Sequence, residues 1–200
     1  MIAMAEDIQL LRELFASSSA VSSAMRRTLD FCGSKYRVPG IQALYDLPFE
    51  QGTGALQNWV QTILRTEPPP GSIKAYYFGL FEIGGKEQME RPCLHICGCE
   101  QFDGEEQDQD WACSPTWRPK GRYANSDVLA ALEDAARHSE EHRIELSYLL
   151  QLTFAGAAIS HVMHSLPKDL TLGDNVTRAL AIGFDSGDLF LLPAIQRSPV

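Results

Sequence analysis

Hydrophobic residues recur every three or four positions in the first third of the chain, and this spacing predicts helices. Residues 6–31 follow the pattern. A run of serines at 17–19 weakens the middle of this stretch, so it forms either one helix or two. Residues 54–66 carry a second stripe of the same kind. Glycines and prolines interrupt residues 32–53, which is typical of a loop. Residues 1–67 therefore predict a helical subregion.

The pattern changes after a proline-rich linker at residues 68–71, because proline ends a helix and restricts the residue before it. Aromatic and β-branched residues dominate 73–83, which predicts a strand. Residues 93–102 predict a second strand that pairs with it as an antiparallel hairpin. Two short apolar segments, 178–184 and 189–192, predict a second hairpin. Between them the sequence Asp-Ser-Gly-Asp favours a tight turn, with glycine supplying the positive φ.

The segment between the two hairpins predicts a pair of helices. One helix has Ser126 as a suitable N-cap, and a longer, more apolar one runs over 139–165 and ends before Pro167. Residues 103–125 are typical of a loop. No internal repeat occurs, so we expect residues 1–200 to form a single α+β domain. Its antiparallel sheet is built from the two hairpins and packs against the helical pair.

Composition restricts the choice of partner and compartment. The chain has 17 Lys and Arg against 26 Asp and Glu, which gives a formal charge of -9. This charge argues against binding to nucleic acid or to anionic membranes, and it is compatible with a basic protein partner. No stretch reaches the roughly 20 apolar residues that a membrane span requires. The cysteine count is odd, at five, and the first segment is charged where a secretory signal would be apolar. We therefore expect a cytoplasmic protein whose thiols are reduced.

Four metal-ligand residue types alternate along one predicted strand: Cys93, His95, Cys97 and Cys99. Alternate residues of a strand share a face, and thiolates with imidazole suit zinc. However, same-face neighbours on a strand lie roughly 7 Å apart, which is too far for one ion. Buried cysteines that pack in the core are therefore the favoured interpretation, and we expect no metal or other cofactor.

A second group of possible ligands consists of His138, His142, His161 and His164, whose spacing does not match H-E-x-x-H. A small metal-binding protein or enzyme that uses either group is the alternative function. The chain contains no nucleophile elbow, P-loop or dinucleotide-binding glycine signature. We therefore predict no catalytic residues and a protein that is not an enzyme.

The acidic segment, residues 99–113, is the strongest indication of function. It has no Lys or Arg and contains six carboxylates, Glu100, Asp103, Glu105, Glu106, Asp108 and Asp110. Trp111 and Trp117 come directly after these residues, and carboxylates beside aromatic side chains predict a partner-binding surface. The alternative is a solvated loop whose aromatic residues only fix it to the core.

Three parts of the chain together resemble one family. They read YFGLFE at 77–82, LHICGC at 94–99 continuing through the acidic segment to the DW at 110–111, and AIGFDSGD at 181–188. This order resembles bacterial immunity proteins of polymorphic-toxin systems or their uncharacterised relatives, over about residues 73–192. The resemblance implies a non-enzymatic cytoplasmic protein that neutralises its cognate toxin by direct binding. An acidic surface suits a basic toxin, because electrostatic steering speeds capture.

Overall fold

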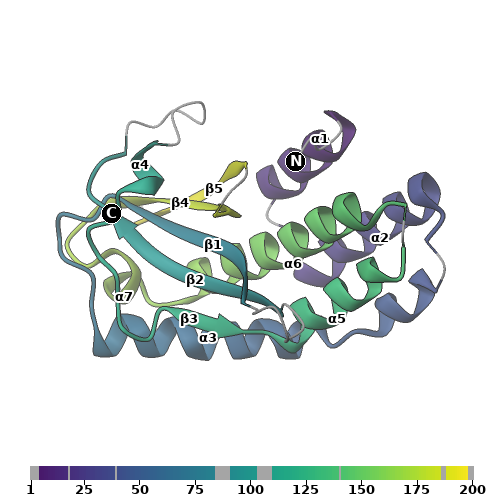
Figure 1. The fold of residues 1–200 in the computed structure, drawn as a ribbon. Helices are drawn as coiled ribbons and strands as arrows, with labels where there is room; N and C mark the ends of the chain where they lie inside the picture. Colours follow the sequence, from purple (N-terminus) through teal and green to yellow (C-terminus); the bar gives the residue numbers. More distant parts are fainter. Residues whose placement is uncertain are drawn as a thin grey trace.

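The computed structural model describes residues 5–17, 19–38, 40–83, 91–102, 110–139, 141–185 and 188–197. Figure 1 shows that the strands gather on one side of the molecule and most helices on the other. Helix α3 runs along the lower edge beneath the strands, while the short helix α4 lies above them (Figure 1). The protein is an α+β protein with a helical N-terminal region, as the sequence predicts.

The helical N-terminal region contains three α-helices and a 3₁₀ helix, namely α1 (Ala5–Ala16), α2 (Val21–Tyr36), η1 (Ile41–Asp46) and α3 (Phe49–Thr66). The first predicted helix is thus two helices, separated near the serine run. The loop predicted over 32–53 is largely wrong. Gly33 lies inside α2 and Gly52 inside α3, whereas Gly40 precedes η1 with a φ of 73°. Gly52 permits close packing, since a Cβ there would collide with Val128. Glycines in a sequence usually indicate a break in a helix, which is why the pattern predicted a loop here.

The sheet has five strands in the order β3-β2-β1-β4-β5. They are β1 (Ala75–Ile83), β2 (Arg91–Cys99), β3 (Tyr123–Asn125), β4 (Thr177–Phe184) and β5 (Leu189–Gln196). Both predicted hairpins are confirmed, because β1 pairs antiparallel with β2 and β4 with β5. Of the turn predicted at 185–188, residues 186 and 187 lie outside the described part of the chain.

The prediction of a wholly antiparallel sheet is wrong, because β1 and β4 are parallel neighbours. Helices lie between these two strands in the sequence. They return the chain to the end of the sheet at which β1 begins, as parallel pairing requires. The hairpins therefore meet along a parallel seam to form a mixed sheet. Residues predicted as loop between β2 and the helical pair supply the edge strand β3 and the short helix α4 (Asp110–Cys113).

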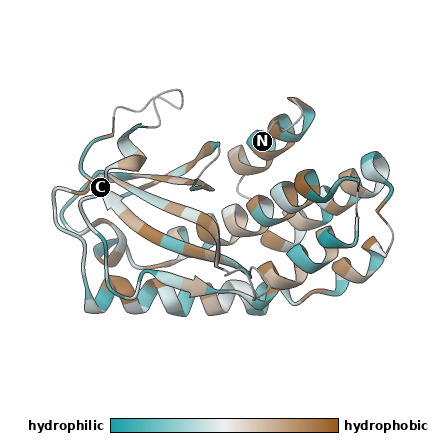
Figure 2. Ribbon diagram, viewed as in Figure 1, coloured by the Kyte–Doolittle hydropathy of each residue, from teal (hydrophilic) through white to brown (hydrophobic). Residues whose placement is uncertain are grey.

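The predicted helical pair is confirmed as α5 (Asp127–Arg137) and α6 (Arg143–Ser165), followed by the short α7 (Lys168–Leu172). Ser126 caps α5, since its side chain accepts a hydrogen bond from the backbone of Leu129. Helix α6 is long and apolar enough to cross a membrane, but 78% of its most apolar window is buried inside the protein. It is the central core helix, and Figure 2 shows hydrophobic residues in the helices around it and along the strands.

The two faces of the sheet have different surroundings. One face contributes Tyr76, Phe78 and Leu80 of β1 to the main hydrophobic core, which includes residues of both the N-terminal helices and α6. The opposite face, which we call the second face, contributes Tyr77 and its neighbours to a smaller cluster packed under Trp111 of α4. The alternation of side chains along β1 thus places the candidate site on the second face.

Candidate functional site

A pocket of about 610 Å³ opens on the second face of the sheet. We call it the sheet-face pocket. Strands β1, β2 and the end of β4 form its floor, and the chain from α4 to β3 forms its wall. Its polar lining includes His95, Arg118, Arg122 and Asp185, and its aromatic lining includes Tyr77, Phe81, Tyr123 and Phe184. A volume of this size lies within the range of small-molecule sites, roughly 300–1,000 Å³.

A hydrogen bond between His95 and Asp185 lies at the centre of the floor, with Nε2 and Oδ1 2.7 Å apart. Strand β1 lies between β2, which carries His95, and β4, which Asp185 directly follows, and Gly79 of β1 is the register partner of His95. A Cβ at Gly79 would collide with both His95 Nε2 and Asp185 Oδ1. Glycine at this position is therefore what lets the imidazole cross β1 and reach the carboxylate.

Aromatic rings surround His95. The centroids of Tyr77 and Phe81 each lie 5.7 Å from the imidazole centroid, and that of Tyr123 lies 6.3 Å away. All three contacts are edge-to-face, the geometry that aromatic quadrupoles favour. The imidazole is thus held by ring packing as well as by Asp185. The sequence indicates His95 as a possible ligand but not the rings around it, because they come together only through the sheet register.

The wall of the pocket carries two guanidinium groups. Arg122 lies over the ring of Tyr123, 4.5 Å from its centroid, and its Nη1 donates to the carbonyl of Pro119 at 3.3 Å. Arg118 lies on the same wall and is exposed. Within the described ranges, neither side chain forms an ion pair with a carboxylate. The pocket therefore presents positive charge in a protein whose formal charge is -9.

The cysteines of β2 share one face with His95, as the alternation predicts. Cys93 donates to the carbonyl of Ala124 at 3.1 Å. A side-chain hydrogen bond with Cys99, followed by burial, raises the pKa of Cys97. The same bond lowers the pKa of Cys99. Both side chains belong to the small hydrophobic cluster of the second face, so they pack as core residues.

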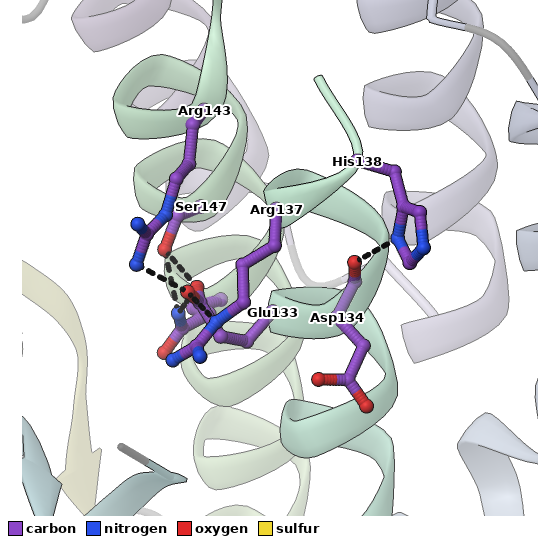
Figure 3. Close-up of polar contacts among 7 residues, drawn as sticks. Glu133, Asp134, Arg137, His138, Arg143 and Ser147 are labelled. Carbon is purple, nitrogen blue, oxygen red and sulfur yellow. Dashed lines mark hydrogen bonds and ion pairs between the residues drawn. The ribbon is translucent and has the colours of Figure 1, made fainter. Parts of the chain in front are cut away.

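The structure does not bring the four candidate histidines together. His138 and His142 lie at the junction of α5 and α6, whereas His161 and His164 lie near the other end of α6. Nineteen residues of helix between His142 and His161 correspond to about 28 Å. His138 Nδ1 bonds to the carbonyl of Asp134 at 2.6 Å (Figure 3). Across the described ranges, no three His, Cys, Asp or Glu residues are placed to share a metal ion.

Only the two ends of the acidic segment are described. Glu100 follows β2, and its carboxylate accepts a hydrogen bond of 2.5 Å from Ser72. Asp110 is exposed and begins α4. The four remaining predicted carboxylates lie outside the described residues, namely Asp103, Glu105, Glu106 and Asp108. The described ends of the segment thus lie at the end of β2 and at α4, which belongs to the wall of the sheet-face pocket.

Both predicted tryptophans are buried. Trp111 packs edge-to-face on Phe102, with centroids 5.1 Å apart, so the two ends of the acidic segment contact each other. Trp117 packs on Tyr76, and its Nε1 donates to the carbonyl of Glu67 at 3.2 Å. The two tryptophans therefore hold the segment and the pocket wall on the protein. This placement matches the interpretation in which the aromatic residues fix the segment to the core.

A buried carboxylate that the sequence did not indicate joins α5 to α6 (Figure 3). Glu133 is 1% exposed, and its Oε1 accepts from Arg137 at 2.9 Å and from Arg143 at 3.4 Å. Its Oε2 accepts from Ser147 at 2.5 Å and from Gln151 at 2.9 Å. Four donors satisfy both oxygens, so this cluster acts as a structural clamp between the helices.

No family model matches the chain, and neither the curated proteins nor the solved structures contain a match to it. The class of the molecule consequently rests on its own geometry. It is an α+β protein with a mixed sheet, one face of which is covered by helices while the other carries a pocket beside an acidic segment.

Proposed function

We propose that the protein is a non-enzymatic binding protein of the immunity type, which neutralises a basic toxin in the cytoplasm by direct contact. The observation that supports this proposal is the anchoring of the acidic segment. One end is fixed to the chain just before β1, through Glu100 with Ser72, and the two ends contact each other through Trp111 with Phe102. A segment held at its base presents its carboxylates to a partner at a smaller entropic cost than a free tail.

The distribution of charge favours a basic partner. Six carboxylates fall between residues 99 and 113 without a Lys or Arg, in a chain of formal charge -9. Clustered like charges repel one another and contribute nothing to folding, so a partner of opposite sign accounts for them. Such a surface raises the rate of encounter with a basic protein.

The arrangement of thiols in the sheet-face pocket agrees with a role in binding. Cys97, the thiol next to His95 on the same face of β2, is held in its protonated form by its bond to Cys99 and by burial, which together raise its pKa. A nucleophilic cysteine requires the opposite shift, toward the thiolate. His95 in turn uses Nε2 in its bond with Asp185.

Co-expression tests this function. The protein is produced in cells together with the toxin domain encoded by a neighbouring gene, and survival and co-purification are measured. The proposal predicts survival and a stoichiometric complex that resists dilution. A matched control toxin from another system should remain lethal. Death of the cells despite soluble, folded protein would contradict an immunity role.

A further inference from the structure

The sheet-face pocket has the features of a small-molecule site in addition to any protein partner. We propose that it binds a small organic anion, a carboxylate or phosphate attached to a planar apolar group. The anion lies against Arg118 and Arg122 of the wall, and the planar group lies on the aromatic floor. This inference goes beyond toxin binding and stands independently of it.

The positive side chains of the wall supply the anion site. Arg118 and Arg122 lie four residues apart and both line the pocket. A guanidinium group matches carboxylate and phosphate oxygens with two parallel donors. Packing on Tyr123 and the bond to Pro119 O hold Arg122 in place before any ligand binds. The lining carboxylate, Asp185, is engaged by His95.

A hydroxyl group that lines the pocket supplies a further donor for the same ligand. Tyr77 is 7% exposed and lines the pocket, and its hydroxyl has no hydrogen-bond partner among the residues that the structure describes. Burial, followed by the negative charge of Asp185, raises the pKa of Tyr77, so the phenol stays protonated and remains a donor. A bound anion supplies an acceptor for this phenolic O–H within the pocket.

The apolar part of the lining determines the other half of the ligand. Phe81, Tyr123, Phe184 and Leu189 present rings and an aliphatic side chain to the pocket. These surfaces favour a planar group that stacks or packs edge-on. A few convergent polar groups within a mostly apolar lining are typical of ligand sites.

Titration with four simple probes tests the proposal. Phenyl phosphate and benzoate carry both features, benzyl alcohol lacks the charge, and inorganic phosphate lacks the ring. Binding is followed by calorimetry and by amide chemical shifts of the full-length protein. We expect saturable shifts at the lining residues with one or both aromatic anions and markedly weaker binding of the other two probes. The tighter of phenyl phosphate and benzoate identifies the anion as phosphate or carboxylate.

Three variants and one control localise the binding. Arg118→Gln and Arg122→Gln should each weaken the affinity about tenfold, the loss expected when a charge-assisted hydrogen bond is removed. Tyr77→Phe keeps the ring and should weaken binding by a smaller factor. Lys120→Gln removes an exposed cation of the same segment that does not line the pocket, and should leave the affinity unchanged.

Two results would overturn the proposal. One is the absence of saturable shifts at the lining residues with either aromatic anion at millimolar concentrations. The other is an equal loss of affinity in Lys120→Gln and in the two arginine variants, which would reduce binding to general electrostatic attraction. Neither result affects toxin capture by the acidic segment, so failure of this site and failure of the proposed function are distinguishable.

Discussion

His95 and Asp185 are separated by 90 residues along the chain, yet Nε2 of the first and Oδ1 of the second lie 2.7 Å apart. The contact joins the β1–β2 hairpin to the β4–β5 hairpin across the parallel seam of the sheet. It is possible because the strand between them carries Gly79 at that position. A hydrogen bond on the second face thus reinforces the pairing of two hairpins that are distant in sequence.

Replacement of Gly79 tests this arrangement. Gly79→Ala places a Cβ against both polar atoms of the contact, so His95 and Asp185 must separate. We expect a loss of about 1–3 kcal/mol in the free energy of unfolding, as for other overpacked sites. Urea denaturation measures it. Gly54→Ala is the control, since nothing lies within 4 Å of its Cβ and a helical alanine stabilises by up to about 1 kcal/mol. Equal stability of the two variants would contradict the role of Gly79.

The buried carboxylate of Glu133 gives a second test. Glu133→Ala removes the acceptor for Arg137, Arg143, Ser147 and Gln151 and leaves their donors near a void. We expect a loss of about 3–5 kcal/mol, as when one partner of a buried ion pair is removed. Asp134→Ala alters the exposed neighbour and should change stability by less than about 0.5 kcal/mol. Chemical denaturation distinguishes these outcomes, and a small effect at Glu133 would show that the clamp contributes little.

The elements that depend on local pattern could be predicted from the sequence, whereas those that depend on long-range pairing could not. Apolar spacing and Ser126 predict the helical pair, and the aromatic run from Tyr76 to Phe81 predicts the first hairpin. The parallel seam leaves no local signal, because the separation of β1 and β4 along the chain does not determine strand order. Helix α3 starts at Phe49, earlier than predicted, because Gly52 suggested a loop, whereas the close approach of Val128 accounts for a glycine inside the helix.

The same distinction applies to the candidate site. The alternation of Cys93, His95 and Cys97 predicts a shared face, which local geometry fixes. The partner of His95 directly follows β4, and Arg122 and Tyr123 come from a segment whose sequence predicts a loop. These residues converge only because of the strand order in the sheet, so the sheet-face pocket could not be predicted from the sequence. Glycine inside the strand pattern at position 79 was the available signal of a close approach.

Alkaline pH should destabilise the protein through Cys32. Burial, together with the negative charge of Asp7, raises the pKa of this thiol from 9.0 to about 12. Between these values the unfolded chain loses the proton while the folded protein keeps it, so stability falls as pH rises. Tyr76, whose pKa burial raises to about 12, adds to the same trend.

Urea denaturation at a series of pH values above 8 measures this trend. Cys32→Ala should give a shallower decline in the free energy of unfolding than the unaltered protein. Identical slopes for the Cys32 variant and the unaltered protein would show that this thiol does not contribute.

The accessibility of the thiols gives a further prediction. Cys113 is exposed, while the other four cysteines are buried, and all five are thiols in the structure. With a thiol reagent, the native protein should show one fast reaction, which Cys113→Ser removes. After denaturation without reductant, five thiols should react. A total below five would indicate a disulfide, and a fast phase that survives in the variant would place a second thiol at the surface.

The most direct measurement for the proposed function is the association rate with the cognate toxin domain as a function of ionic strength. Reversal of charge at Asp103, Glu105, Glu106 and Asp108 is compared with a control that reverses four exposed acids elsewhere, Asp46, Asp134, Glu141 and Asp174. Both variants have the same net charge, so they differ only in where it lies. The account predicts a rate that falls with salt and a strong decrease in the loop variant alone, with both melting temperatures nearly unchanged. Equal rates for the two variants, or a rate independent of salt, would contradict the acidic segment as the toxin-binding surface.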